Sequence, residues 1–225
     1  TVPTAPISAS GAGLLLSYTN AAIYDSSEVA DYGTFGTAQI NTSTKKYGTG
    51  SMSFDGTGDY LTVSKDKYPQ FINGTGNWTI EFWVNYNALP TGSVGASTGC
   101  SWYAQDSGGA VVSPFNLIQA GNDWYLYADT SGSGGWNIFS QTVLATTNLT
   151  TGVWYHVACV RVGSLVKLFI NGTQVGSASI GTNSIWTTST YDLYLFGAWQ
   201  NGDGSQGLNG YVDDYRLTKG YARYW

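Results

Sequence analysis

Apolar and polar residues alternate along many short stretches of this chain, which is the pattern of half-buried β-strands. The clearest stretch is WTIEFWVNY at 78–86, where every second residue from Trp78 onward is apolar and faces one side. Glu81 and Trp83 face the other side, which we expect to be part-exposed or covered by a loop. The predicted strands are 14–19, 51–54, 60–64, 78–86, 115–119, 124–129, 154–162, 166–171, 173–180, 192–198 and 209–218.

Turn residues separate these runs. In KLFINGTQV, Asn171 and Gly172 suit the positive φ angles of a type I′ turn, so this segment is predicted to be a β-hairpin. Many short strands with turn signals at this spacing predict an all-β, two-sheet antiparallel sandwich. No repeat or interdomain linker is visible, and we expect a single domain at 12–225 after an N-terminal extension at 1–11.

Composition supports the all-β prediction and excludes several classes of function. Only 10% of the 225 residues are charged, 15% are aromatic and 30 are glycine, which is typical neither of long helices nor of disorder. The net charge is −5 and no Lys or Arg lies between Lys67 and Arg161, so we expect no nucleic-acid partner. No apolar run reaches the roughly 18 residues of a spanning helix, so no membrane insertion is expected. The start at Thr1 in place of Met, without a signal-peptide pattern, indicates processing, excision or a protein that begins before this residue.

The sequence does not predict an enzyme. Retaining glycoside hydrolysis needs two carboxyl groups about 5 Å apart, but the only glutamates are Glu28 and Glu81, and the strand after Glu81 carries no second acid. His156 is the only histidine, and its place in an alternating strand indicates a packed side chain instead of a catalytic base. The closely spaced His and Cys ligands of a zinc site are also missing from the sequence.

Calcium is the one ion that the sequence leaves open, and no motif requires a cofactor. Asp55 and Asp59 flank a GTG turn and can meet across it, and Asp214 is the third candidate ligand. In the alternative interpretation, Asp55 and Asp59 accept hydrogen bonds from loop amides, and Asp214 pairs with Arg216 or a backbone N–H. In a regular strand Asp213 and Asp214 would face opposite sides, so both could not bind one ion.

Carbohydrate binding is the sharper hypothesis for a site. Sugars are held by aromatic faces together with amide and carboxylate hydrogen bonds, and loops of this chain carry both kinds of group. The alternative is that the tryptophans fill the core and edges of a large sandwich. The candidate carbohydrate-binding residues are Trp102, Tyr103, Trp136, Trp199, Asn201 and Asp203.

Several motifs in order resemble a known family. SMSFDGTGDYLTV, NWTIEFWVNYNALP, TGVWYHVACVRVGSLVKLFINGTQVGSA and GYVDDYRLTKGYARYW are similar to the laminin G-like members of the concanavalin A-like lectin/glucanase superfamily. The resemblance covers 12–225 and implies a jelly roll of two antiparallel sheets, with the terminal strands adjacent. For function it is less specific, because this fold hosts lectins, glycosidases, adhesion modules and structural domains.

A narrower likeness concerns the context of the domain. The segments at 3–27 and 38–61 and the ending RLTKGYARY are similar to laminin G-like domains of tailed-bacteriophage structural proteins. This implies a non-enzymatic module on the virion surface, a decoration of tail, fibre or capsid, whose partners are other virion proteins, copies of itself or a cell-surface glycan. Such relatives continue past the final Arg–Tyr pair, so we expect a longer protein. The alternatives are a secreted lectin-like carbohydrate-binding module and, more remotely, a glycan hydrolase.

Overall fold

The computed structural model describes residues 2–8, 14–18, 23–25, 32–64, 74–90, 100–102, 115–131, 135–186, 193–197 and 207–225. Every regular element in these ranges is a β-strand. These ranges contain no helix long and apolar enough to span a membrane. The strands are β1 (Leu14–Tyr18), β2 (Ile23–Asp25), β3 (Tyr32–Phe35), β4 (Gln39–Asn41), β5 (Ser51–Asp55), β6 (Tyr60–Val63), β7 (Trp78–Ala88), β8 (Cys100–Trp102), β9 (Phe115–Ala120), β10 (Asp123–Ala128), β11 (Phe139–Thr146), β12 (Trp154–Val162), β13 (Leu165–Ile170), β14 (Thr173–Ser179), β15 (Leu193–Leu195) and β16 (Asn209–Lys219).

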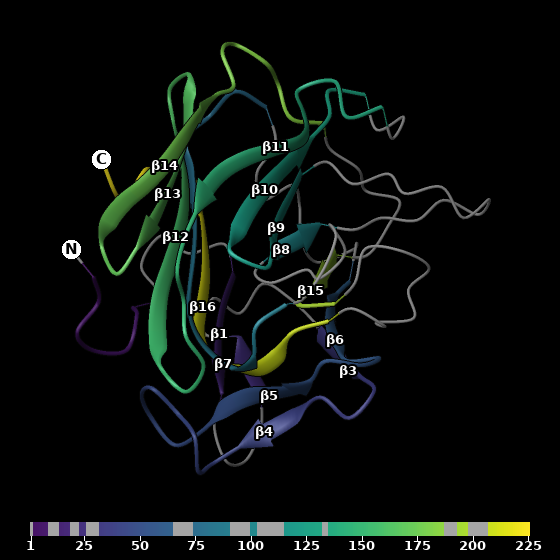
Figure 1. Cartoon of the computed structure of the whole chain (residues 1–225), viewed down its shortest axis with the longest axis vertical. Helices are drawn as coiled ribbons and strands as arrows, with labels where there is room; N and C mark the ends of the chain where they lie inside the picture. The colour runs from purple at the N-terminus through teal and green to yellow at the C-terminus, as the bar shows by residue number, and fades with distance from the viewer. Residues whose placement is uncertain are drawn as a thin grey trace.

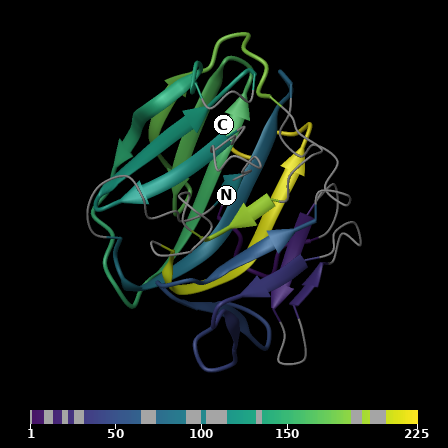
Figure 2. The ribbon, with the colours of Figure 1, turned by 90° about the vertical axis from the view of Figure 1, so that its right-hand side faces the viewer.

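The strands form two layers (Figure 1). One layer is a large sheet in the order β14-β13-β12-β7-β16-β1-β2, with β5 also paired to β16 and β4 paired to β5. The other layer contains a small sheet, β11-β10-β9-β8, beside the three strands β15-β6-β3 (Figure 2). Leu14 of β1 pairs with Leu217 of β16, so the terminal strands are adjacent. The predicted antiparallel all-β sandwich is therefore confirmed.

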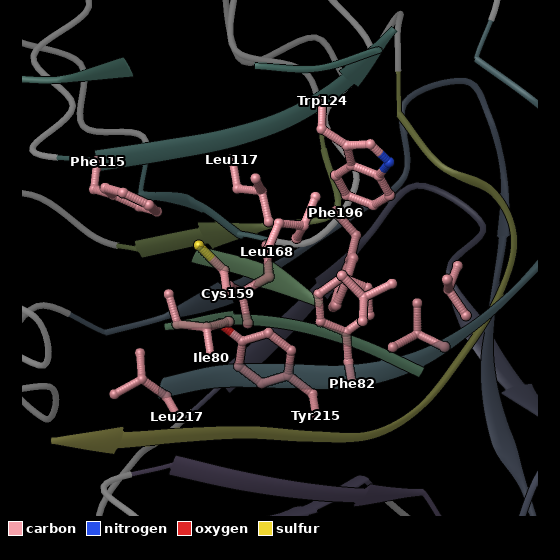
Figure 3. Close-up of a cluster of buried hydrophobic side chains, with 14 of the residues drawn as sticks. Ile80, Phe82, Phe115, Leu117, Trp124, Cys159, Leu168, Phe196, Tyr215 and Leu217 are labelled. Atoms are coloured by element: carbon pink, nitrogen blue, oxygen red, sulfur yellow. The ribbon is translucent and has the colours of Figure 1, made fainter. Parts of the chain in front are cut away.

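The core lies between the layers and is built by the period-2 pattern of the strands. From β7 it receives Trp78, Ile80 and Phe82, and across from them the small sheet contributes Phe115 and Trp124, all at most 1% exposed (Figure 3). Burial of one such side chain contributes about 1.5–3 kcal/mol to folding. These two facing rows of large residues hold the sheets together.

Two local features fix how the sheets meet at one side. Asn171 and Gly172 have φ of 49° and 78°, as the predicted type I′ hairpin between β13 and β14 requires. In β14, a Cβ atom on Gly176 would lie 1.8 Å from the carbonyl oxygen of Leu144 in β11. Only glycine permits this close approach, which brings an edge strand of each sheet into contact.

Strand β16 is not regular, contrary to the expectation for its two aspartates. The pairing with β7 shifts register between Asp213 and Arg216, and Asp214 has φ of 48°. Such a β-bulge re-aims side chains, so the assumption that Asp213 and Asp214 alternate as in a flat strand was wrong. Both carboxylates instead reach segments that cross the outside of the large sheet.

The outer face of the large sheet is closed by chain segments. We call residues 2–8 and 221–225 the terminal clasp; the ends of the chain lie near each other in both views (Figures 1 and 2). Ala222 and Tyr224 of the clasp pack on Ala158, Val160 and Phe169 in a second, small apolar cluster. Together with Lys46 and Tyr47, which pack on Trp83, the clasp leaves every residue of β7 from 78 to 86 buried, including those that face away from the main core. Of the two expectations for the Glu81 face, coverage is correct.

Candidate functional site

Aromatic side chains gather on the outer face of the small sheet. In β10, Leu126 faces the core, whereas Tyr125 and Tyr127 point away from it. The ring of Trp136, from the β10–β11 turn, meets that of Tyr127 edge to face at a centroid distance of 5.2 Å. Val143 of β11 pairs with Tyr125 and is 53% exposed. We call Tyr125, Tyr127, Trp136 and Val143 the aromatic patch.

Trp136 is held in an unusual backbone conformation. Its φ is 47°, in the left-handed region that bulky residues seldom adopt. The neighbouring Asn137 secures the turn, since its Oδ1 accepts from the backbone N–H of Thr130 at 2.9 Å and its Nδ2 donates to Thr130 Oγ1 at 2.7 Å. Strained residues of this kind cluster at binding sites, where the surrounding structure holds them in place.

Hydrogen-bonding groups flank the rings. Asp123 accepts from the hydroxyl of Tyr125 at 3.3 Å and from Oγ1 of Thr146 at 2.6 Å. Burial, with a smaller contribution from Asp123, raises the pKa of Tyr125, and burial with the influence of Tyr125 raises the pKa of Tyr127 to about 12. Both phenols therefore stay protonated at neutral pH, and that of Tyr125 donates its hydrogen to Asp123. Rings with neutral donors and carboxylate acceptors at their edges suit the binding of a polyhydroxylated ligand.

The structure describes the position of only one side chain of the predicted carbohydrate-binding set. Trp136 lies in the patch. Trp102 belongs to β8 by its backbone, but its side chain and the whole of Tyr103, Trp199, Asn201 and Asp203 lie outside the described residues. Trp124, another tryptophan of the same region, is a core residue whose Nε1 donates to Thr147 Oγ1 at 3.0 Å.

The patch also contains residues that the sequence analysis missed. Tyr125 and Tyr127 were not proposed, although the alternation in DWYLYA places them on the face opposite Trp124. That period-2 signal could have found them. Val143 was missed because β11 was not predicted as a strand.

The three candidate calcium ligands do not form one cluster. Asp55 and Asp59 do meet, because the hydroxyl of Thr37 lies 2.8 Å from Asp55 Oδ2 and 3.3 Å from Asp59 Oδ1. Asp59 also accepts from the backbone N–H groups of Thr37 and Asp55, and Asp55 accepts from that of Thr57. Asp214 instead accepts from the N–H of Ile7 in the terminal clasp at 3.1 Å. Among the described residues no three acidic, His or Cys side chains gather as a metal site would require.

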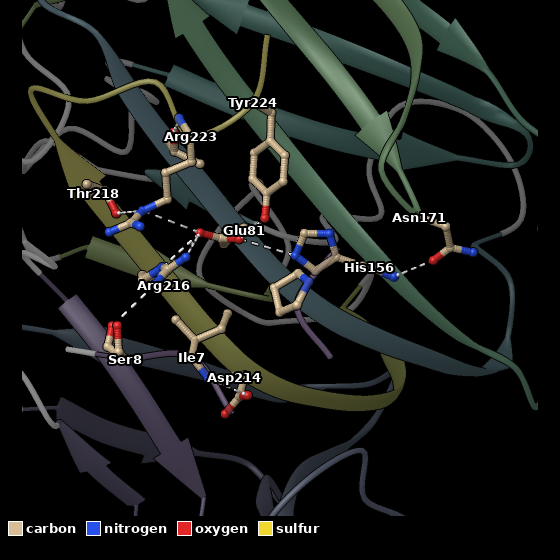
Figure 4. A network of polar contacts seen from close by, with 12 residues as sticks. Ile7, Ser8, Glu81, His156, Asn171, Asp214, Arg216, Thr218, Arg223 and Tyr224 are labelled. Atoms are coloured by element: carbon tan, nitrogen blue, oxygen red, sulfur yellow. Dashed lines mark hydrogen bonds and ion pairs between the residues drawn. The ribbon is translucent and has the colours of Figure 1, made fainter. Parts of the chain in front are cut away.

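A second set of reactive side chains lies beneath the terminal clasp (Figure 4). Glu81 Oε1 accepts from Nε of Arg216 at 2.8 Å and lies 3.8 Å from Nε of Arg223. Glu81 Oε2 accepts from the hydroxyl of Tyr224 at 2.5 Å and from Nε2 of His156 at 3.2 Å. Burial alone would raise the pKa of Glu81, but hydrogen bonds from His156 and Tyr224 and the charge of Arg216 outweigh it and hold the pKa below its ordinary value.

This buried network is closed to substrate. Glu81 and His156 are both 0% exposed. The expected packed histidine is confirmed, since the His156 ring lies edge-on to Trp83 and beside Tyr224. The network joins β7, β12 and β16 to the C-terminal part of the clasp, so its role is to hold that segment on the sheet. The aromatic patch remains as the candidate binding site.

Two antiparallel layers around one core, with an open aromatic surface on the smaller one, define a lectin-type jelly roll. A laminin G family model, described as the concanavalin A-like lectin/glucanases superfamily, matches residues 55–221. The chain belongs to this superfamily. No curated protein sequence matches the chain.

Solved structures with a similar fold include saccharide-bound domains. Domain 4 of AbnA, an extracellular arabinanase from Geobacillus stearothermophilus, in complex with arabinotriose, is 15% identical with a TM-score of 0.63, covering 94% of this chain and 93% of that one. The binding domain of botulinum neurotoxin serotype D is 16% identical with a TM-score of 0.65. That of botulinum neurotoxin DC, in complex with SialylT, is 12% identical with a TM-score of 0.64.

The two toxin domains differ from the arabinanase domain in the extent of the match. The similarity covers 93% and 94% of this chain, respectively, but only 48% of each toxin binding domain, so the chain spans about half of their length. At these identities the likeness concerns the fold.

Proposed function

We propose that this domain is a non-enzymatic, lectin-like module that binds carbohydrate through the aromatic patch. The observation that carries the proposal is the grouping of the part-exposed Tyr125 and Trp136 with the buried Tyr127 on the outer face of the small sheet, with Asp123 and Asn137 nearby. Ring faces pack on the C–H surfaces of sugars, and the polar edges bind hydroxyl groups. A turn held in a strained conformation before the ligand arrives reduces the entropy lost on binding.

The comparisons support a saccharide as the ligand. The arabinanase domain, of nearly the same extent as this chain, was solved with arabinotriose. A shared fold does not by itself transfer a ligand. It does make a saccharide the first class of ligand to test on the patch.

The absence of catalysis is part of the same proposal. The chain has two glutamates, and Glu81 is bound by Arg216, His156 and Tyr224 beneath the terminal clasp. Among the described residues, the patch carries Asp123 but no second acid paired with it across an open cleft. Release of reducing sugar by the protein, abolished in Glu81→Gln, would contradict this part of the proposal.

A virion surface is the cellular context that we propose for the module, with a secreted lectin-like protein as the alternative. The support is the resemblance of the segments at 3–27 and 38–61 and of RLTKGYARY to bacteriophage structural domains. In that context the patch would face host glycans while other surfaces contact virion proteins. Detection of the protein in purified particles by mass spectrometry would support this context, and its recovery only from the culture medium would support the alternative.

A glycan array tests the binding function. Wild-type protein should bind a subset of glycans, and Trp136→Ala should lose that signal. Trp225→Ala is the matched control, because Trp225 is 73% exposed but belongs to the terminal clasp. Equal signals from wild type and Trp136→Ala would remove the patch from the site, and no signal from wild type would contradict carbohydrate binding.

A further inference from the structure

The ionisable groups next to the aromatic patch, among the described residues, are carboxyl groups and tyrosines, with no cation among them. Asp123 lies at one end, within hydrogen-bonding distance of Tyr125. Asp129 follows β10 at the other end and is fully buried; its Oδ1 accepts from the N–H of Ser131 at 3.1 Å, but its Oδ2 has no hydrogen-bond partner. Both groups are carboxyl groups, and neither can serve as a cation toward a ligand.

No cation of the described chain balances these carboxylates. The patch lies within 68–160, which contains no Lys or Arg. The strands beside the small sheet, β14 next to β11 and β15 next to β8, also lack them. Arg161 ends the stretch without cations, but it is 1% exposed and donates to the carbonyl groups of Gly163, Gly74 and Asn183.

Lys167 and Lys219 belong to the large sheet: Lys167 alternates in β13 with the core residues Val166 and Leu168, so its side chain faces away from the core, and Lys219 is the last residue of β16. Lys46 lies 4.1 Å above the ring of Trp83 on the outer face of the large sheet. Arg216 and Arg223 bind Glu81 on that same face. Lys45 bonds to the carbonyl group of Thr42.

An acidic sugar would therefore meet no counter-charge at the patch. Carboxylate and sulfate groups are normally held by Arg or Lys through charge-assisted hydrogen bonds. Two like charges at 4 Å repel by about 1 kcal/mol in water and by more near a protein surface. A neutral sugar needs no counter-charge and is not repelled by like charge. It can still bind to the rings, the phenols and the carboxylate acceptors.

We propose that the aromatic patch selects uncharged saccharides and discriminates against sialylated, uronate-containing and sulfated ones. This selectivity rests on the proposed carbohydrate-binding function and adds the class of ligand to it.

The test is an array in which each neutral oligosaccharide stands beside its sialylated, uronate or sulfated counterpart. Wild type should bind neutral members about tenfold more tightly than their acidic counterparts, which corresponds to about 1.4 kcal/mol. Val143→Lys places a cation opposite Tyr125 at an exposed position, and it should raise binding of the acidic members. Tyr221→Lys adds the same charge on the clasp, at a residue 56% exposed, and should leave the ratio unchanged.

The outcomes separate the selectivity from the function. Equal or tighter binding of acidic members by wild type, lost in Trp136→Ala, would overturn the selectivity while the function stands. A ratio that changes equally in Val143→Lys and Tyr221→Lys would overturn the role of the patch in setting it. An array without binding to either class would overturn both proposals.

Discussion

On the outer faces of the two sheets, how deeply a side chain is buried does not follow from its polarity. The outer face of the large sheet carries Glu81, His156 and Arg216, yet these three side chains are buried beneath the terminal clasp. The outer face of the small sheet carries Tyr125, Tyr127 and Trp136, of which Tyr125 and Trp136 remain part-exposed while Tyr127 is buried. The polarity of a strand face therefore does not determine which face is available to a ligand. The chain segments that cross the sheet determine it.

The closed face shows what such a covering requires. A buried carboxylate is tolerated only when donors surround it, and Glu81 receives them from β12, β16 and the clasp. On the open face, water can serve the polar groups, so Asp123 needs only Tyr125 and Thr146. We expect substitutions on the closed face to change stability and those on the open face to change binding.

The largest effect should come from Glu81→Gln. Loss of the carboxylate leaves Arg216 buried without its counter-charge, and the free energy of unfolding should fall by about 3–5 kcal/mol in urea titrations. Asp123→Asn makes the same chemical change on the open face and should cost less than about 1 kcal/mol. Similar losses for both variants would remove the distinction between the faces.

The pH dependence of the Glu81 effect follows from its lowered pKa. A carboxylate whose folded pKa is below the ordinary value of 4.5 stabilises the fold above that pH. The difference between wild type and Glu81→Gln should be complete above pH 4.5 and shrink as the pH falls through the folded pKa. A difference that grows in acid would contradict the network.

Asp214→Asn should stabilise the protein, whereas Glu81→Gln should destabilise it. Burial, followed by repulsion from Asp213, raises the pKa of Asp214 from 3.8 to about 7. Since the folded pKa is above the unfolded value, wild type loses stability as the pH rises from 3.8 to 7. Asparagine tolerates the φ of 48° and can still accept from Ile7. The variant should gain on the order of 3 kcal/mol at pH 8 and nothing near pH 4, as measured by unfolding at both values.

Tyr224→Phe tests whether the hydrogen bond to Glu81 holds the C-terminal part of the terminal clasp on the sheet. It removes the hydrogen bond to Glu81 but keeps the ring that packs against Phe169. A hydrogen bond to a charged group contributes about 1.5–3 kcal/mol. Hydrogen exchange should show faster opening of 221–225, and protection equal to wild type would contradict this role.

Trp136→Ala should have the smallest effect on stability. The residue is part-exposed, and its contact with Tyr127 contributes about 1 kcal/mol at most. The melting temperature should therefore change little while glycan binding is lost. A large loss of stability would move Trp136 from the binding patch to the structural core.

Much of the fold was predictable because alternation specifies strands wherever one face is buried in an apolar core. The predicted bounds of β12 agree with the structure, and those of β7 extend only two residues further. β11 was missed because its alternation is interrupted by shifts in register and by a φ of 49° at Gln141. β2, β3, β4 and β8 are three or four residues long, too short for a period to be recognised.

The candidate site was less predictable from the chain alone. Trp136 was identified by its aromatic ring in a loop, but its partner Tyr127 was not, since their contact depends on the turn between β10 and β11. The sequence by itself determined the sandwich, the core residues and the absence of cations from 68–160, because these follow from local periodicity and composition. Only the tertiary structure decided that the clasp covers Glu81 and leaves Tyr125 open, because burial depends on segments that are distant in sequence and adjacent in space.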